Sequence, residues 1–298
     1  MADLKTKYMG LELRSPIIAG SCGLTSDVEK MVEMEKAGVG AVVLKSIFEE
    51  QINEETSGVF KAGYGMGDAY PEAEDYIKAY IRSNTIQKYV ELVRNAKSRL
   101  TIPVIASVNC FSGGEWVSFA RQLEEAGADA LELNVFILPV NEFKESAEVE
   151  NVYFEIVKSI KSQIKIPVSV KISHYFTNLS AFVDKIKAYG ANATTLFNRF
   201  YEPDININTL EMGAASVFST AAELRTTLRW TGILAGKDKR LEISASTGVH
   251  GGEATVKLLL AGATTVQVCS VLYEKGIHVI EDINNFIGKW MDSKAFKT

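Results

Sequence analysis

One short pattern recurs along the chain and constrains the fold more than any other feature. An amphipathic run ends at a glycine and leads within a few residues into a short apolar run, at residues 36–45, 125–134, 188–198 and 260–269. Each glycine stands where the C-cap residue of a helix adopts positive φ. The short apolar run that follows is typical of a buried strand. Each copy therefore predicts a helix, a tight turn and a strand.

Further strands fit between these copies. The additional apolar runs lie at residues 16–20, 103–108, 167–172 and 241–245, and the last three follow amphipathic segments around 87–99, 151–163 and 220–231. Together they give eight strands that alternate with helices, and most are nearly continuous apolar runs, as strands buried on both faces are. The pattern predicts an α/β fold, a (β/α)8 TIM barrel, over the alternative of a doubly wound open sheet.

Two additions to the barrel are expected. Residues 5–9 and 11–14, on either side of Gly10, predict a small N-terminal hairpin that closes the bottom of the barrel. Residues 49–83 and 199–216 exceed ordinary βα loops and are expected to be long loops on the catalytic face, as lids or pocket walls. The first of these holds several tyrosines, which could equally pack the segment against the barrel.

Composition narrows the function classes. The chain has 298 residues, is 47% hydrophobic, and carries a net charge of −5 without a basic cluster, so nucleic acid is not an expected partner. No apolar run approaches ~18 residues, so no membrane span is expected. Three cysteines are too few for a disulfide framework or a zinc site and suit the cytoplasm, and three histidines leave little room for a metal centre. We expect one domain over residues 1–298.

Small and amide-bearing residues gather at the predicted strand ends, where barrel enzymes place their chemistry. They do not make a carboxylate dyad, a metal cage or a Ser-His-Asp triad. Instead they make a ring of hydrogen-bond donors that suits a flat heteroaromatic ligand carrying an anion. The residues at or just past the strand ends are Ala19, Ser21, Cys22, Lys45, Ser46, Asn109, Cys110, Asn134, Lys171, Ser173, Asn198, Ser246 and Ser270.

The last two loops indicate where the anion binds. Residues 244–249 precede a helix expected near Gly251, and residues 268–271 precede the final helix. The loops after the seventh and eighth strands form the usual phosphate site of a barrel. Flavin mononucleotide (FMN) is therefore the leading cofactor candidate, and a nearby cation such as Lys45 or Lys171 would stabilise its reduced anionic form. Either lysine could instead be a solvated strand end, and Asn134 a turn residue.

At these residues the chain resembles the dihydroorotate dehydrogenase family over essentially its whole length. It is similar to the soluble branch, which lacks a membrane-binding N-terminal extension, and the sequence FEEQI at residues 48–52 resembles a divergent dihydroorotate dehydrogenase-like subgroup. The stretches that carry the resemblance are residues 8–17, VLKS at 43–46, LELN at 131–134, VKI at 170–172, LFN at 196–198, ASTGV at 245–249 and VQVCS at 266–270.

The resemblance implies roles for individual residues. Lys45 would lie by flavin and substrate, Asn134 would contact both, Lys171 would reach the flavin ring, and Asn198 would line the substrate pocket. Backbone amides would bind the FMN phosphate at Thr247, Gly248, Cys269 and Ser270. The resemblance also implies a homo-oligomer, a dimer by analogy, and a small-molecule substrate.

One stretch departs from the family. Where the family has a reactive Cys or Ser two residues after the asparagine, this chain has Phe136 and Ile137, which cannot take a proton. Residues 64–71 also lack the family's substrate-holding asparagine motif. General-base catalysis contributes about 10²–10⁴-fold, so its loss would slow dihydroorotate oxidation without abolishing flavin chemistry, and a replacement base could come from another loop. The candidates are Cys110, Cys22, His174, Tyr64 and Glu142, and Cys110 is favoured by position, although the cysteines could be buried hydrophobes and His174 structural.

Three functions remain open. The first is an FMN-dependent oxidoreductase that oxidises dihydroorotate to orotate in pyrimidine synthesis, or a related cyclic CH–CH compound, with Lys45, Asn134 and Cys110 as the catalytic residues. The second is a flavin-binding protein without dehydrogenase turnover. The third is a flavin-free barrel enzyme that uses Lys45 or Lys171 as a Schiff-base amine.

Overall fold

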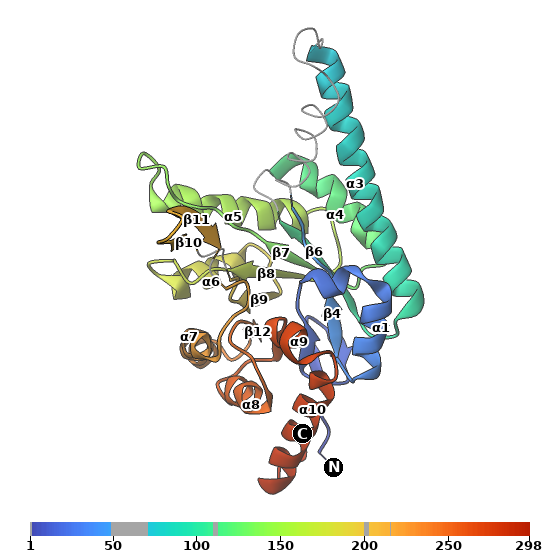
Figure 1. Ribbon diagram of the computed structural model, residues 1–298, viewed down its shortest axis with the longest axis vertical. Coiled ribbons are helices and arrows are strands. Elements are labelled where there is room, and N and C mark those ends of the chain that lie inside the picture. The colour runs from blue at the N-terminus through green and yellow to red at the C-terminus, as the bar shows by residue number, and fades with distance from the viewer. Residues whose placement is uncertain (1, 49–70, 110–112, 200–202, 215) are drawn as a thin grey trace.

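Eight parallel strands close into a ring, which confirms the barrel predicted from the repeated pattern (Figure 1). The computed structural model describes residues 2–48, 71–109, 113–199, 203–214 and 216–298. Pairing of Val266 with Ile17 joins the last strand to the first. In order around the ring the strands are β3 (Ile17–Ala19), β4 (Ala41–Val43), β6 (Val104–Asn109), β7 (Ala130–Asn134), β8 (Val168–Ile172), β9 (Ala193–Leu196), β12 (Glu242–Ala245) and β13 (Thr265–Val268), while β5 (Ile47–Phe48) extends the edge of β6.

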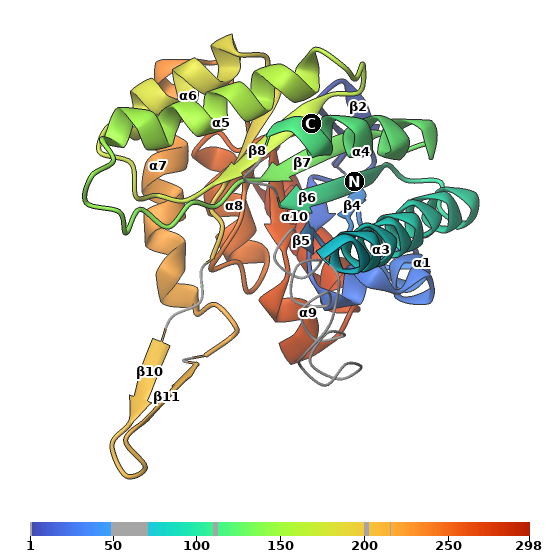
Figure 2. The same ribbon diagram turned by 90° about the horizontal axis from the view of Figure 1, so that it is seen from above.

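Helices cover the outside of the barrel (Figures 1 and 2). The glycines of the repeated pattern, Gly38, Gly127, Gly190 and Gly262, all have positive φ, between 96° and 112°. The predicted C-cap turns are therefore confirmed. The helices are α1 (Val28–Lys36), α3 (Pro71–Arg99), α4 (Gly113–Glu125), α5 (Ser146–Lys161), α6 (Leu179–Ala188), α7 (Leu224–Lys237), α8 (Gly252–Leu260), α9 (Ser270–Lys275) and α10 (Val279–Ser293), with short 3₁₀ turns η1 (Gly23–Ser26) and η2 (Ala221–Glu223).

The predicted N-terminal hairpin is present and closes the end of the barrel where the strands begin. It consists of β1 (Thr6–Tyr8) and β2 (Leu11–Leu13) in antiparallel pairing. Its buried side chains pack against the first residues of the barrel strands, among them Ala41 and Ala130. The Tyr8 hydroxyl donates to Ser169 Oγ, 3.2 Å away inside the barrel.

The two long catalytic-face segments contain regular structure that was not predicted. Helix α3 begins at Pro71, so the second half of the segment 49–83 is helical. The residues of this half, PEAEDYIKAYIRS, are mostly good helix formers and contain no glycine. Within 199–216, β10 (Pro203–Asn206) and β11 (Glu211–Ala214) form a hairpin that projects from the barrel (Figure 2). Residues 49–70, including Tyr64, lie outside the described residues.

In the part of the chain that the structure describes, no helix combines the length and apolar character needed to cross a membrane.

Candidate active site

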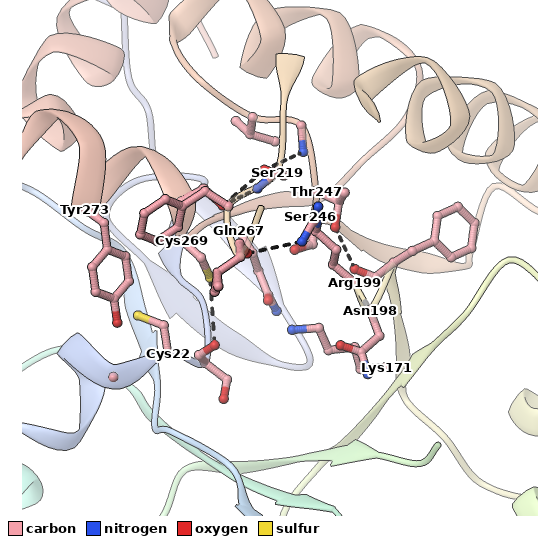
Figure 3. Close-up of a pocket in the computed structure, with 18 residues that line it drawn as sticks. Cys22, Lys171, Asn198, Arg199, Ser219, Ser246, Thr247, Gln267, Cys269 and Tyr273 are labelled. Carbon is pink, nitrogen blue, oxygen red and sulfur yellow. Dashed lines mark hydrogen bonds between the residues drawn. The ribbon is translucent and has the colours of Figure 1, made fainter. Parts of the chain in front are cut away.

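A cavity of about 610 Å³ opens at the carboxyl ends of the barrel strands (Figure 3). Barrel enzymes bind their ligands at this end, and the volume lies within the range of about 300–1,000 Å³ typical of small-molecule sites. Its walls come from the loops after β3, β9, β12 and β13, from Lys171 on β8, and from the segment before η2. The cavity thus lies at the strand ends where the sequence predicts a ligand site.

The turn after β12 is the predicted phosphate site, and we call it the anion cradle. Thr247 and Gly248 have φ of 77° and 78°, two consecutive residues in the left-handed region. A side chain on Gly248 would place Cβ 2.2 Å from the backbone nitrogen of Leu224, so glycine is needed here for space as well as for conformation. The Thr247 hydroxyl donates to the Phe197 carbonyl at 3.0 Å and holds the turn. Helix α8 follows at Gly252 without a side-chain cap on its first N–H groups.

Two serine hydroxyls and one imidazole lie beside this turn. They belong to Ser219, Ser270 and His250, which we together call the hydroxyl cluster. Ser219 Oγ lies 3.1 Å from Ser270 Oγ and 3.2 Å from Nε2 of His250. The backbone N–H of Ser219 also donates to Ser270 Oγ, at 2.9 Å. On its other side, His250 Nδ1 lies 3.0 Å from a carboxylate oxygen of Glu274, which fixes the ring. The Gly248 N–H donates to Ser219 Oγ at 3.4 Å, so the hydroxyl cluster is tied directly to the turn.

A buried carboxylate lies deeper in the barrel and holds the lysine of β8. Glu132 Oε2 accepts hydrogen bonds from Gln267 Nε2 at 2.7 Å and from Thr195 Oγ1 at 2.9 Å. Its other oxygen lies 3.7 Å from Lys171 Nζ, and the two side chains are 1% and 7% exposed. Figure 3 shows the Lys171 amine directed into the cavity beside Gln267. A carboxylate this deeply buried needs a counter-charge, so Glu132 and Lys171 depend on each other.

Amide groups complete the wall near Lys171. Asn198 Nδ2 donates to Asn134 Oδ1 at 2.7 Å and links the ends of β9 and β7. Two buried carbonyl oxygens, Asn109 Oδ1 and Gln267 Oε1, have no hydrogen-bond partner among the described residues. Buried acceptors are rarely left in this condition in proteins. A planar ligand that carries N–H donors would satisfy an acceptor such as that of Gln267, which lines the cavity.

The residues predicted from the strand ends fall into three groups. Lining the cavity are Ser21, Lys171, Asn198, Ser246, Thr247, Gly248, Cys269 and Ser270. Buried close behind the described lining are Ala19, Ser46, Asn109 and Asn134. Lys45 is exposed and does not line the cavity formed by the described residues, and Cys110 lies outside the described residues. The roles assigned to Lys45 and Cys110 stay predictions.

Several site residues were not identified as such from the sequence. Glu132 and Gln267 carried a usable signal, because each is a polar residue inside an otherwise apolar strand. Ser219 and Tyr273 lie in the segment before η2 and in α9, and nothing in their local sequence marks them. Arg199, which also lines the cavity, pairs with Glu223 at 3.0 Å.

The loop after β7 has a different character. Its apolar residues 136–139 line a second cavity of about 890 Å³, together with residues of α5 and of the loop after β8. Leu138 is 63% exposed. Of the candidate bases, Glu142 lines this second cavity. The His174 ring packs edge-on against Phe197, with centroids 5.6 Å apart, and partial burial lowers the pKa of His174 below its usual value.

Fold and site together define a TIM-barrel protein whose catalytic-face cavity joins the turn at Thr247 and Gly248 to a buried lysine–carboxylate pair. The sequence matches the family described as dihydroorotate dehydrogenase over residues 3–291, and the chain belongs to that family. Members of this family are oxidoreductases that bind FMN. The resemblance inferred from the sequence motifs is confirmed.

Archaeal relatives match the chain along nearly its full length. A protein of Thermoplasma acidophilum named dihydroorotate dehydrogenase B (NAD(+)), catalytic subunit, is 30% identical over 99% of this chain and 96% of its own length. Proteins with the same name from Thermoplasma volcanium and Pyrococcus furiosus are 27% and 26% identical, over 100% and 99% of this chain and 96% of their own lengths.

Proposed function

We propose that this protein is an FMN-dependent oxidoreductase that oxidises dihydroorotate, or a related cyclic CH–CH compound, to the alkene. The observation that carries the proposal is the conjunction of the anion cradle at Thr247 and Gly248 with the buried Lys171–Glu132 pair in one cavity. A phosphorylated planar ligand needs both an anion site and polar groups at its ring, and this cavity provides both.

The residues present fit FMN. The cradle and the hydroxyl cluster would hold the phosphate, and Lys171 and Asn198 would contact the ring system. Gln267 Oε1, a buried acceptor without a partner among the described residues, suits a ring N–H. When bound, FMN supplies the hydride acceptor. The Glu132 carboxylate keeps Lys171 oriented toward the cavity, at 3.7 Å from its amine.

On the substrate side of the site, we propose that another residue replaces the family's catalytic base. Asn134, hydrogen-bonded to Asn198, would orient the substrate, and Lys45 would lie near it, as the family resemblance implies. Cys110 follows β6 and remains the favoured base. His174 is an alternative, because its lowered pKa leaves it neutral and able to accept a proton near pH 7.

The visible spectrum of freshly purified protein, followed by anaerobic addition of dihydroorotate, tests this function. We expect a yellow protein whose flavin absorbance bleaches with dihydroorotate. A protein that stays colourless after incubation with FMN would contradict the flavin reading. Bleaching with dithionite but not with dihydroorotate would reject dihydroorotate as the substrate and direct the search to other cyclic CH–CH compounds.

A flavin-binding protein without dehydrogenase turnover is the second candidate, favoured by the apolar residues Phe136 and Ile137. It predicts tight FMN binding with no bleaching by any cyclic CH–CH substrate. The Schiff-base alternative is less well supported, because a Schiff-base amine must be neutral whereas Lys171 faces a buried carboxylate.

Partner proteins follow from the names of the relatives. Because these are catalytic subunits, we include in the proposal that this chain passes electrons to a partner subunit. The homodimer in the proposal comes from the family resemblance. Light scattering after size-exclusion chromatography measures the second point, and a monomer at micromolar concentration would contradict it.

A further inference from the structure

Two cysteines lie in the wall of the cavity, at the seam where the first and last barrel strands meet. Cys22 follows β3 and Cys269 follows β13, and both line the cavity. The two thiols are close enough for each to shift the pKa of the other. Figure 3 shows the two sulfur atoms on the same side of the cavity, with the Tyr273 hydroxyl beside Cys22. Both are free thiols.

The backbone around the pair keeps the two thiols close. The N–H of Gly20 donates to the carbonyl of Val268 at 2.9 Å, so the chain segments that carry the cysteines leave the sheet as neighbours. A side chain on Gly20 would place Cβ 2.5 Å from the Cys269 sulfur, so glycine makes the room that this thiol occupies. The Cys269 sulfur also lies 3.9 Å from the carbonyl oxygen of Ser21. Proximity is therefore built into the barrel closure.

The two thiols have unequal acidity, which suits them to different roles. The hydrogen bond from Cys269, with those from the Leu24 and Thr25 backbone, lowers the pKa of Cys22 to about 6 against the effect of burial. The same hydrogen bond, together with burial, raises the pKa of Cys269 well above its usual value. At neutral pH, Cys22 is thus largely the thiolate and Cys269 the thiol. A low-pKa cysteine beside a second cysteine is the arrangement found in redox-sensitive sites.

We propose that Cys22 and Cys269 form a peroxide-sensitive modification site that closes to an intramolecular disulfide. In the first step the Cys22 thiolate attacks hydrogen peroxide, the O–O bond breaks, and Cys22 sulfenic acid and hydroxide form. In the second, the Cys269 sulfur attacks the Cys22 sulfur, and the S–O bond breaks as the thiol proton and the hydroxyl leave as water. Overall, two thiols and one peroxide give one disulfide and two waters.

The modification would tie together two walls of the cavity. The loop after β3 and the loop after β13 both contribute lining residues, so a bond between them fixes their separation. The reaction needs peroxide but no cofactor, and it can be followed whether or not FMN is bound. Its failure is therefore distinct from a failure of the proposed oxidoreductase function.

Peptide mapping tests the proposal on the full-length protein as purified. The protein is reduced, desalted, treated with a few equivalents of hydrogen peroxide at pH 7, blocked with N-ethylmaleimide and digested with trypsin without reductant. Trypsin separates Cys22, Cys110 and Cys269 into different peptides, because it cleaves at Lys30, Lys257 and the basic residues between them. We expect a linked Cys22–Cys269 peptide as the main product, lost on treatment with dithiothreitol.

Variants assign the linkage. Cys110→Ser, which removes the third cysteine, should still form the linked peptide, whereas Cys22→Ser and Cys269→Ala should not. Cys22 accumulating as sulfinic acid beside an unreacted Cys269 in the unsubstituted protein would overturn the proposal. So would a disulfide that involves Cys110, or two chains joined through their cysteines.

The pH dependence of alkylation gives a second test that requires no oxidant. In the reduced protein, the rate at which iodoacetamide modifies Cys22 should rise with pH through a midpoint near 6, because the thiolate is the reactive form. In Cys269→Ala the hydrogen-bond donor is lost, and the midpoint should move toward the ordinary value of about 8.5. A midpoint near 8.5 in the unsubstituted protein would overturn the assignment of Cys22 as the attacking sulfur.

Discussion

The cavity wall near the anion cradle is rich in hydrogen-bonding groups, whereas the loop after β7 is apolar. At the cradle, backbone conformation, hydroxyl groups and a fixed histidine converge on one point. After β7, the chain runs through residues 136–139, which are apolar, and these face a different cavity. Both regions lie on the catalytic face of one barrel.

The difference teaches which half of a family site can change independently. Groups that bind a cofactor through backbone amides depend on the path of the main chain, which packing enforces. A catalytic base is one side chain on one loop, and a substitution there leaves the fold intact. This contrast is the basis for proposing a retained cofactor half beside a rebuilt substrate half.

The largest effect is expected from breaking the buried pair on the cofactor half. Glu132→Gln preserves shape but leaves Lys171 as an uncompensated buried charge, which costs about 3–5 kcal/mol of unfolding free energy. Urea denaturation measures this loss. The double variant Glu132→Gln, Lys171→Met should recover part of it. Equal stability of the single variant and the unsubstituted protein would show that the two groups are not coupled.

The apolar loop can be tested by restoring a base. Phe136→Cys places a thiol two residues after Asn134, where the family has its reactive residue. Because Phe136 lines the second cavity rather than the first, we expect it to accelerate flavin reduction by dihydroorotate by no more than about 10²-fold. Stopped-flow absorbance under anaerobic conditions measures the rate. Phe136→Ala is the control, because it opens the same space without a proton acceptor. Equal acceleration by both variants would mean that space, rather than a base, limits the reaction.

The cradle can be broken by adding one methyl group. Gly248→Ala combines positive φ with a contact of 2.2 Å to the backbone of Leu224, and the resulting strain of about 1–3 kcal/mol should weaken FMN binding by roughly 10–100-fold. Quenching of flavin fluorescence reports the Kd. Gly236→Ala in α7, where an added Cβ meets no atom within 4 Å, should leave binding unchanged. Unchanged binding in Gly248→Ala would move the phosphate site elsewhere.

A small effect is expected at the edge of the hydroxyl cluster. Glu274→Gln weakens the contact that orients His250, and because this carboxylate is partly exposed, FMN binding should weaken by only about two- to fivefold. The same fluorescence titration measures it. Glu33→Gln, in α1 where it pairs with Lys30, is the matched surface control. A loss as large as that of Gly248→Ala would mean that the histidine itself holds the anion.

Much of this molecule was predictable because its information is local. The glycine C-caps and buried strands repeat, so the barrel and the hairpin followed from short stretches of sequence. Lys45 shows the limit, since its place just past β4 does not determine that its side chain is exposed. Ser219 and Tyr273 reach the cavity only through tertiary packing of segments with no distinctive pattern. The roles of Glu132 and Gln267 required knowing which strand residues point inward.

The seam between β3 and β13 has a consequence for how the molecule comes into being. Ser21 and Cys269, in contact there, are separated by 248 positions in the chain. During synthesis β3 can therefore pair with β13 only after nearly the whole chain has been made. Contacts this distant in sequence form slowly. The cavity wall that contains both cysteines is complete only when the ring closes. Until then β3 and β12 present open edges that can pair with other chains, so aggregation competes with assembly of the site.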